Sequence, residues 1–318
     1  MTYLVTAGRL AGLAVPGMPI HESYAGATFW VDSNGGSDLG TGRGTFNLPY
    51  ATVNYAIGRC SADSGDEVHI KPGHNEGGTA ADLFDFTIAG VSVIGHGHGD
   101  SRPTFDYDAT GTTIGISAAN AYLENVILRA SVNIVTTAFI VDGTYAHLHN
   151  VEFKDELIGT DEFVDCITTT GVDNSEDGLT VTSSKYLTTS AGVNSFIVLE
   201  NANRFITVMG NIVSVATAAG SGQNFIRQGT AGDVQTMITL VGNYYSGQGT
   251  GHDTGDAVLL GGTGTHTGIA TWNRMGTLDT AGGKLIADGN NILKAENYQT
   301  SDADAGGALW PIATVHGS

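Results

Sequence analysis

Two acidic runs in this sequence have the residue types that glycan-cleaving and cation-binding sites use. The denser run holds Asp155, Glu156, Asp161, Glu162 and Asp165, and the second holds Asp173, Glu176 and Asp177. Two carboxylates at a fixed separation can hydrolyse a glycosidic bond, and clustered carboxylates can bind Ca²⁺. Both runs are flanked by glycine and threonine, as loops are. We therefore favour solvated loops, with a glycan or cation site as the alternative.

Two pairs of histidines are each separated by one residue: His96 with His98, and His147 with His149. In a β-strand, this spacing places both imidazoles on one face. Zinc binds such pairs, but it needs a third protein ligand, and the sequence names none. We therefore predict no metal site here, and we predict no catalytic residue and no cofactor elsewhere.

Residues 32–38, DSNGGSD, resemble the first half of a calcium loop because oxygen-bearing side chains alternate along them. A calcium loop has glycine at its sixth position and glutamate at its twelfth, where this sequence has Ser37 and Arg43. A turn rich in aspartate and asparagine is the better interpretation. Tyr244 and Tyr245 have rings that can stack on a sugar, although such rings more often pack against a neighbouring coil or subunit.

The composition excludes several partners. With 13 basic and 32 acidic residues, the formal charge is −19, which repels nucleic acid and anionic membranes. Cys60 and Cys166 match no metal or redox spacing, so we expect two buried free thiols. The sequence shows no secretion signal and no membrane-spanning run, and we therefore expect folding in a cytoplasm.

Short apolar strands recur along the chain and predict a solenoid. They begin near Ile114, Phe139, Val164, Phe196, Phe225 and Val258, at intervals of 25 to 33 residues. A repeat of this length cannot bury its own apolar face, so the core must come from stacking one coil on the next. With 46 glycines and 14% charged residues, the chain suits many strands and tight turns.

A second strand in most repeats is interrupted by a turn that carries asparagine. The turn residues are Asn125, Asn150, Asn211 and Asn243. Asparagine tolerates the left-handed backbone conformation, so one residue can bend the strand sharply. We predict that these four side chains stack as a ladder along the solenoid, as asparagines do in other stacked sheets. The rung at Ser184 and Lys185 is irregular.

These patterns predict an all-β fold: a right-handed parallel β-helix with a short N-terminal capping helix. The helix is expected within residues 49–60, where Val53, Ala56, Ile57 and Cys60 share one helical face. The predicted divisions are an N-terminal arm at 1–28, a cap at 29–73, coils at 74–294 and a C-terminal cap or tail at 295–318.

Residues 29–73 resemble the opening of the pectate-lyase-like superfamily of β-helices. The segments that carry the resemblance are FWVDSNGGSDLGTGRGTFNLPYATVNYAI and GDEVHIKPGHNE. IGHGHGDSRPTFDYDATGTTIGISAANAYLENVIL is similar to phage and prophage β-helix proteins. The resemblance implies a non-catalytic protein of the virion surface, a capsid decoration protein or short spike, that is assembled in the host cytoplasm.

The resemblance also implies partners and an alternative activity. It implies a homotrimer that docks to other capsid or tail proteins through residues 1–28 and that contacts host surface glycan. The alternative is a tailspike-like hydrolase or lyase. Lyase relatives pair a basic residue with an Asp-rich Ca²⁺ site. Here the cations along the coils are Arg102, Arg129, Lys154, Lys185, Arg204, Arg227 and Arg274, and we expect none beside a repeated aspartate pair.

Overall fold

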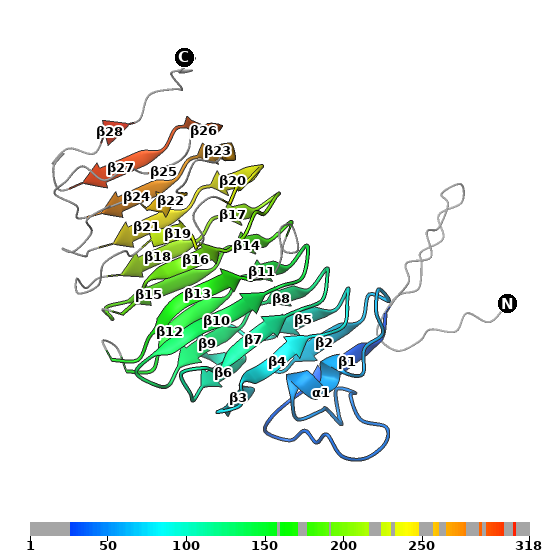
Figure 1. The fold of residues 1–318 in the computed structure, drawn as a ribbon. Helices are drawn as coiled ribbons and strands as arrows, with labels where there is room; N and C mark the ends of the chain where they lie inside the picture. The colour runs from blue at the N-terminus through cyan, green and yellow to red at the C-terminus, as the bar shows by residue number, and fades with distance from the viewer. Residues whose placement is uncertain are drawn as a thin grey trace, which may run out of the picture.

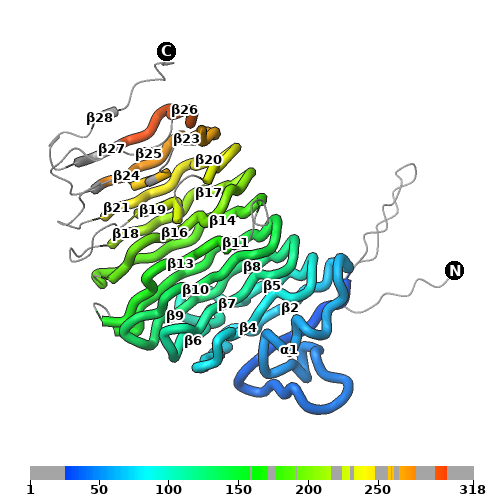
Figure 2. Tube along the Cα trace, in the orientation of Figure 1, coloured from blue at the N-terminus to red at the C-terminus, as the bar shows by residue number. Residues whose placement is uncertain are grey.

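The computed structural model describes residues 26–157, 160–170, 177–190, 192–215, 224–229, 233–247, 257–260, 265–277, 286–287, 291–301 and 308–309. Its strands stack as successive coils of a rod with three sheets (Figure 1), which confirms the predicted parallel β-helix. The chain colours follow one another along the rod (Figure 2), because each coil lies on the one before it.

Sheets A and B form two sides of the rod and have ten strands each. Sheet A contains β1 (Thr28–Val31), β2 (Glu67–Ile70), β5 (Ser92–Gly95), β8 (Tyr122–Glu124), β11 (His147–His149), β14 (Thr180–Thr182), β17 (Thr207–Met209), β20 (Ile238–Val241), β23 (Thr267–Thr271) and β26 (Asn291–Ala295). Sheet B contains β3 (Asn75–Gly78), β6 (Thr104–Tyr107), β9 (Ile127–Ala130), β12 (Glu152–Asp155), β15 (Lys185–Thr188), β18 (Ile212–Val215), β21 (Tyr244–Gly247), β24 (Arg274–Thr277), β27 (Tyr298–Ser301) and β28 (Ala308–Leu309).

Sheet C forms the third side and has eight strands. They are β4 (Asp82–Phe86), β7 (Thr113–Ile116), β10 (Val135–Val141), β13 (Phe163–Thr169), β16 (Ser195–Leu199), β19 (Asn224–Gln228), β22 (Val258–Leu259) and β25 (Ile286–Ala287). Neighbouring strands in the sheets are parallel, apart from the terminal pair of β27 with β28. Each position along a strand therefore recurs in the next coil, and the side chains at that position form a row along the rod.

The core consists of apolar side chains that stack in register. In sheet A, one buried row comprises Val68, Val93, Leu123, Leu148, Val181, Val208 and Leu240. In sheet B, the facing row comprises Phe105, Leu128, Phe153, Tyr186, Val213, Tyr245 and Met275. Burying one such side chain contributes about 1.5 to 3 kcal/mol, and no single coil encloses these rows.

The turn between sheets A and B uses two successive positions. The first is left-handed in the coils from β8 onward, at Asn125, Asn150, Ser183, Gly210, Gly242, Trp272 and Glu296. The second holds the next residue, which in the later coils is Asn211, Asn243, Asn273 and Asn297, all buried. The sequence had suggested one equivalent position for four asparagines. Instead, Asn125 and Asn150 bend the backbone, whereas glycine performs that bend beside Asn211 and Asn243.

Asparagines at the second turn position hydrogen-bond along the rod. The Nδ2 group of Asn243 donates to Oδ1 of Asn273, and that of Asn273 donates to Oδ1 of Asn297, each over 2.9 Å. Backbone N–H groups bond to the same oxygens. Asn125 and Asn150 form a separate pair at the first position, where Nδ2 of Asn150 donates to Asn125. Each row fixes one coil against the next at the same corner.

The N-terminal end of the rod carries the predicted short helix, α1 (Val53–Ile57) (Figure 1). Thr52 caps it by accepting a hydrogen bond from the N–H of Tyr55. Its buried face includes Val53, Ala56 and Ile57, and Cys60 follows it as a buried free thiol, as Cys166 also is. Among the described residues, no helix has the length and hydropathy needed to cross a membrane.

The coils extend beyond the predicted limits of 74 and 294. β1 and β2 already pair in register with the sheet A stack, so solenoid pairing begins at Thr28. At the other end, β27 pairs in parallel with β24, and Asn297 belongs to the buried asparagine row. The repeat continues there because Asn297 accepts hydrogen bonds from Asn273 in the turn, although few large apolar residues surround it in sequence. Residues 1–25 of the predicted arm lie outside the described residues.

Candidate functional site

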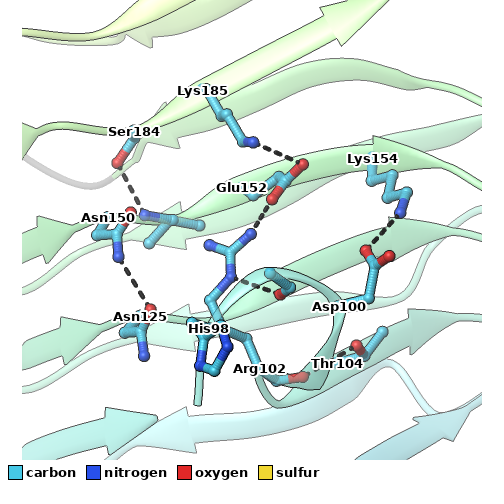
Figure 3. Close-up of polar contacts among 12 residues, drawn as sticks. His98, Asp100, Arg102, Thr104, Asn125, Asn150, Glu152, Lys154, Ser184 and Lys185 are labelled. Carbon is cyan, nitrogen blue, oxygen red and sulfur yellow. Dashed lines mark hydrogen bonds and ion pairs between the residues drawn. The ribbon is translucent and has the colours of Figure 1, made fainter. Parts of the chain in front are cut away.

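Charged side chains gather on the outer face of sheet B. Alternate residues of β6, β9, β12 and β15 point away from the core. A loop before β6 adds the charges of Asp100 and Arg102 beside those of β12 and β15 (Figure 3). We call this surface the charged face, and it comprises Asp100, Arg102, Asp106, Asp108, Arg129, Glu152, Lys154, Glu156 and Lys185. In a chain with only 14% charged residues, it is a pronounced local concentration.

Glu152 lies at the centre of the charged face. One carboxylate oxygen accepts from the Arg102 guanidinium, and the other lies 3.0 Å from Nζ of Lys185 (Figure 3). The Arg102 side chain is almost fully buried, and its Nε also donates to the carbonyl of Gly99. Arg102 is therefore a fixed group, whereas the Lys185 ammonium remains accessible to solvent.

Gly99 belongs to a short 3₁₀ turn, η1 (Gly99–Ser101), which holds Asp100 above the sheet. Asp100 is exposed and pairs with Nζ of Lys154 over 3.2 Å, across two coils (Figure 3). Exposed pairs of this kind are weak because water screens both charges. The Asp100–Lys154 pair can therefore break at low cost in free energy, and each side chain can then bind a polar ligand.

Arg129 and Asp106 form a second fixed unit on the charged face. Nε and Nη2 of Arg129 donate to the two carboxylate oxygens of Asp106 over 2.6 and 2.7 Å. Asp108 lies beside this pair, close to Gly77, where a Cβ would come within 3.0 Å of its carboxylate. Asp106 and Asp108 alternate along one chain segment, so Arg129 lies beside a single aspartate pair, which differs from the repeated pair that the sequence expectation concerned.

The electrostatics of the charged face shift two pKa values in opposite directions. Desolvation, followed by the nearby charges of Arg102 and Lys154, lowers the pKa of Lys185. Desolvation, with Asp106 and Glu156, raises the pKa of Asp108, while Arg129 opposes the rise. A lysine shifted downward and an aspartate shifted upward are the directions that general bases and general acids need near neutral pH.

The other three cations named from the sequence lie outside the charged face. Arg204 and Arg227 pair with carboxylates, and Arg274 stacks on a ring. Arg204 bonds to Asp177 through Nε, and Arg227 approaches Asp165. The Arg274 guanidinium lies over the ring of Tyr298, with 5.9 Å to its centroid.

Sheet A carries a row of rings on its outer face. Trp30 stacks on His69 and His96 with centroid distances of 5.0 and 5.2 Å. Nδ1 of His69 lies 2.8 Å from Nε2 of His96, so one ring donates to the other. Further along, Tyr122 meets His147 edge to face at 5.0 Å. These rings cover one another's faces, so they act mainly as packing between coils.

The two histidine pairs differ from each other. His147 and His149 share the outer face of β11, as alternation predicts, and both rings contact Oγ1 of Thr182. His96 and His98 do not form such a pair, because Gly97 between them has a φ of +107° and breaks the strand. Within the described ranges, no three histidine, cysteine or acidic side chains are grouped as metal ligands would be.

The denser acidic run is not the solvated loop that the sequence favoured. Asp155, Asp161 and Glu162 are buried. Asp155 accepts from the hydroxyls of Tyr186 and Ser190 over 2.8 and 3.0 Å, and also from Thr188. Burial raises its pKa despite these bonds. The local composition concealed this because the hydroxyl partners lie about one coil later in the chain.

Other sequence-based candidates have structural roles. In segment 32–38, Oδ1 of Asp32 accepts from the N–H of Asn34, which confirms the predicted turn. Asp38 accepts from Thr52 and thereby ties this turn to the capping helix. Tyr244 is exposed and Tyr245 is buried in the core. Asp177 of the second acidic run is also buried, while Asp173 and Glu176 lie outside the described residues.

Comparison with known proteins gives a fold-level likeness. No family model matches the chain, and no curated protein matches it. A solved rhamnogalacturonan lyase is similar in structure, with a TM-score of 0.48 and 14% sequence identity, covering 86% of this chain and 87% of that one. A likeness at this level carries no argument about activity.

Proposed function

We propose that this protein binds an extended polysaccharide along the charged face of sheet B. The observation that carries the proposal is the concentration of acidic and basic side chains on four consecutive coils of an otherwise charge-poor rod. Sugar hydroxyls donate to carboxylates and accept from lysine and arginine, so a face with both signs suits them. A formal charge of −19 favours a neutral or weakly acidic glycan over a densely anionic one.

The regular geometry of the rod supports an extended ligand. Successive coils repeat at about 4.7 to 4.9 Å, so Asp106, Arg129 and Lys154, which are in register on β6, β9 and β12, present charged groups at even intervals. Arg129 is held by Asp106, so its free donors need little ordering when a ligand binds. Lys154 and Lys185 supply adaptable contacts at the surface.

Retention on immobilised polysaccharides tests this proposal. The probes are neutral and uronate-containing bacterial surface polysaccharides, and the variant is Lys154→Ala with Lys185→Ala. We expect at least one probe to retain the native chain and the double variant to lose about tenfold in affinity, as two polar contacts predict. Arg59→Ala, at an exposed position beyond the capping helix, is the matched control. Equal retention of native chain and double variant would refute the proposal.

We further propose, from the sequence resemblance, that the rod stands on a virion surface as a capsid decoration protein or short spike. Docking through residues 1–28 and assembly in the host cytoplasm belong to this proposal. Mass spectrometry of purified particles tests it, since the chain must be present there in a fixed copy number. A chain found free in the lysate but missing from particles would contradict it.

A second candidate is cleavage of a uronate-containing glycan by β-elimination, with Lys185 as the base because its amine is accessible on the charged face and desolvation lowers its pKa. In this step Lys185 takes the proton next to the uronate carboxylate, and its electron pair forms the new C=C bond. The glycosidic C–O bond then breaks, and the leaving oxygen takes a proton from solvent. Release of unsaturated oligosaccharide that Lys185→Met abolishes would establish cleavage, whereas retention without product supports binding alone.

A further inference from the structure

The outer face of sheet A changes character along the rod. Near the N-terminal end it carries rings and carboxylates, but from β14 to β23 its outward residues are uncharged. They are Thr180, Thr182, Thr207, Met209, Thr239, Val241, Ile269 and Thr271. We call this surface, with the turn residues that border it, the apolar face. The outward residues of these four strands therefore add nothing to the formal charge of −19.

Large apolar side chains protrude from the apolar face. Their exposed fractions range from 42% for Met209 to 62% for Trp272, and the others are Phe205, Met237 and Ile269. Leu293 of β26, in register with Ile269, extends this row by one strand. Phe205, Met237 and Ile269 border a groove of about 390 Å³, which Gly268 helps to line. Contiguous exposed apolar surface of this kind marks an interaction site.

Backbone conformation adds an independent argument. Phe205, Met237 and Trp272 have φ values of +60°, +57° and +61°. Bulky side chains are strained in this left-handed region, where glycine or asparagine is comfortable, as in the turns at Gly242 and Asn150. Each of the three residues is thus both strained and exposed to water. The turns need their left-handed backbone but not their large side chains, so the exposed side chains point to a contact with another surface.

We propose that the apolar face binds a second copy of this chain. Two chains with a charge of −19 repel each other, and an uncharged surface lets them approach with the least repulsion. A separate acidic or basic partner would find no charged side chain among the outward residues of β14, β17, β20 and β23.

The apolar face is also complementary to itself. Its groove lies where the strands begin, since Phe205 and Met237 precede β17 and β20, whereas Trp272 follows the end of β23. A rotation axis parallel to the rod places the strand-end edge of one copy against the strand-start edge of the next. Trp272 of one copy then fills the groove of its neighbour at the same height. Such a knob-to-groove contact closes into a ring under cyclic symmetry.

Light scattering of the full chain at several concentrations tests this proposal. We expect the measured molar mass to be two or more times that of one chain. A mass of three chains, the predicted homotrimer, would support the interface, as would any other closed oligomer. The variant combining Met237→Asn with Trp272→Asn should have the mass of a single chain. Asparagine tolerates the left-handed conformation, so circular dichroism and thermal unfolding should show a folded rod. Leu187→Thr, which removes an exposed apolar side chain from sheet B, is the matched control.

Salt provides a second readout. Because association brings together chains of the same sign, raising the ionic strength should strengthen it, opposite to an interface made of ion pairs. A native mass of one chain at every concentration, or an unchanged mass in the double variant, would overturn the proposal. Loss of polysaccharide retention without any change of mass would also overturn it, because the apolar face would then bind glycan. Charged-face variants test the proposed function separately, and they should leave the mass unchanged.

Discussion

Nδ2 of Asn211 donates to Oδ1 of Asn243 over 3.0 Å, joining two residues that are 32 positions apart in the chain. The same oxygen also accepts from the backbone N–H of Asn211. Asn243 in turn donates to Asn273 and to the carbonyl of Val208. One buried amide thus satisfies polar groups of three coils, at a corner where water cannot reach them.

Replacing Asn243 with alanine should destabilise the rod strongly. The substitution leaves the backbone N–H of Asn211 without its acceptor in a buried turn. It also removes one of the two bonds of the Asn211 Nδ2 group, and the bonds that Asn243 donates to Val208 and Asn273. Each such loss costs about 1 to 3 kcal/mol, so we expect the free energy of unfolding to fall by about 2 to 5 kcal/mol. Equilibrium unfolding in urea measures this change.

Asn150→Gly is the matched control for this prediction. Asn150 occupies the first turn position, is partly exposed, and makes one side-chain bond to Asn125. Glycine adopts its φ of +52° without strain, so the expected change is below about 1 kcal/mol. Equal effects of the two substitutions would mean that the buried row does not hold the coils together.

The sequence predicted the coils because their apolar rows must repeat once per turn of the rod. It did not separate the two turn positions, because an asparagine that bends the backbone and one that bonds along the axis occur in the same local pattern. Asn125 and Asn211 therefore appeared equivalent. The distinction depends on the preceding residue, which is Glu124 before Asn125 but Gly210 before Asn211. Glycine immediately before the asparagine was the available signal.

The charged face was less predictable. Its central contacts join Arg102 with Glu152, 50 positions apart, and Asp100 with Lys154, 54 positions apart. Such pairs span two coils. Because the coil length varies between 25 and 33 residues, the sequence does not show which residues lie in register two coils apart. Each cation therefore looked isolated in the sequence, although stacking brings them onto one surface.

Glu152→Gln should destabilise the rod far more than Asp100→Asn does. Glu152 is the carboxylate partner of the buried Arg102 guanidinium, and removing one member of a buried pair costs about 3 to 5 kcal/mol. Asp100 and Lys154 are exposed, so their pair contributes at most about 1 kcal/mol. Urea unfolding of the two variants under identical buffer conditions measures both effects. Similar losses in the two variants would show that Arg102 is solvated in solution.

Asp155→Asn should reduce the dependence of stability on pH. Burial raises the folded pKa of Asp155 above its unfolded value. The protonated form is therefore favoured in the folded state, and stability is lost as pH rises from below about 4 through the folded pKa. Asparagine cannot ionise, and its amide can still bond to the hydroxyls of Tyr186 and Ser190.

The measurement is the free energy of unfolding at about pH 3 and about pH 7, where Asp155 is largely protonated and largely ionised, respectively, in the unfolded chain. The native protein should lose more stability between the two values than Asp155→Asn loses. Asp142→Asn, at an exposed position, should behave as the native protein does. A steeper pH dependence in Asp155→Asn would contradict the burial argument.

Both cysteines should resist thiol reagents until the rod unfolds. Burial, with a contribution from Asp66, raises the pKa of Cys60 to about 12. Cys166 is fully buried, and burial raises its thiol pKa well above the usual value, so little thiolate exists at either site. At about pH 8, a disulfide reagent should modify neither thiol in the folded protein and both in strong denaturant.

Cys60, which lies beside the capping helix, should react first as denaturant is added, because end coils have fewer neighbours than central ones. Mass spectrometry of partly labelled protein identifies the site, and earlier labelling of Cys166 would show that the rod opens from its centre.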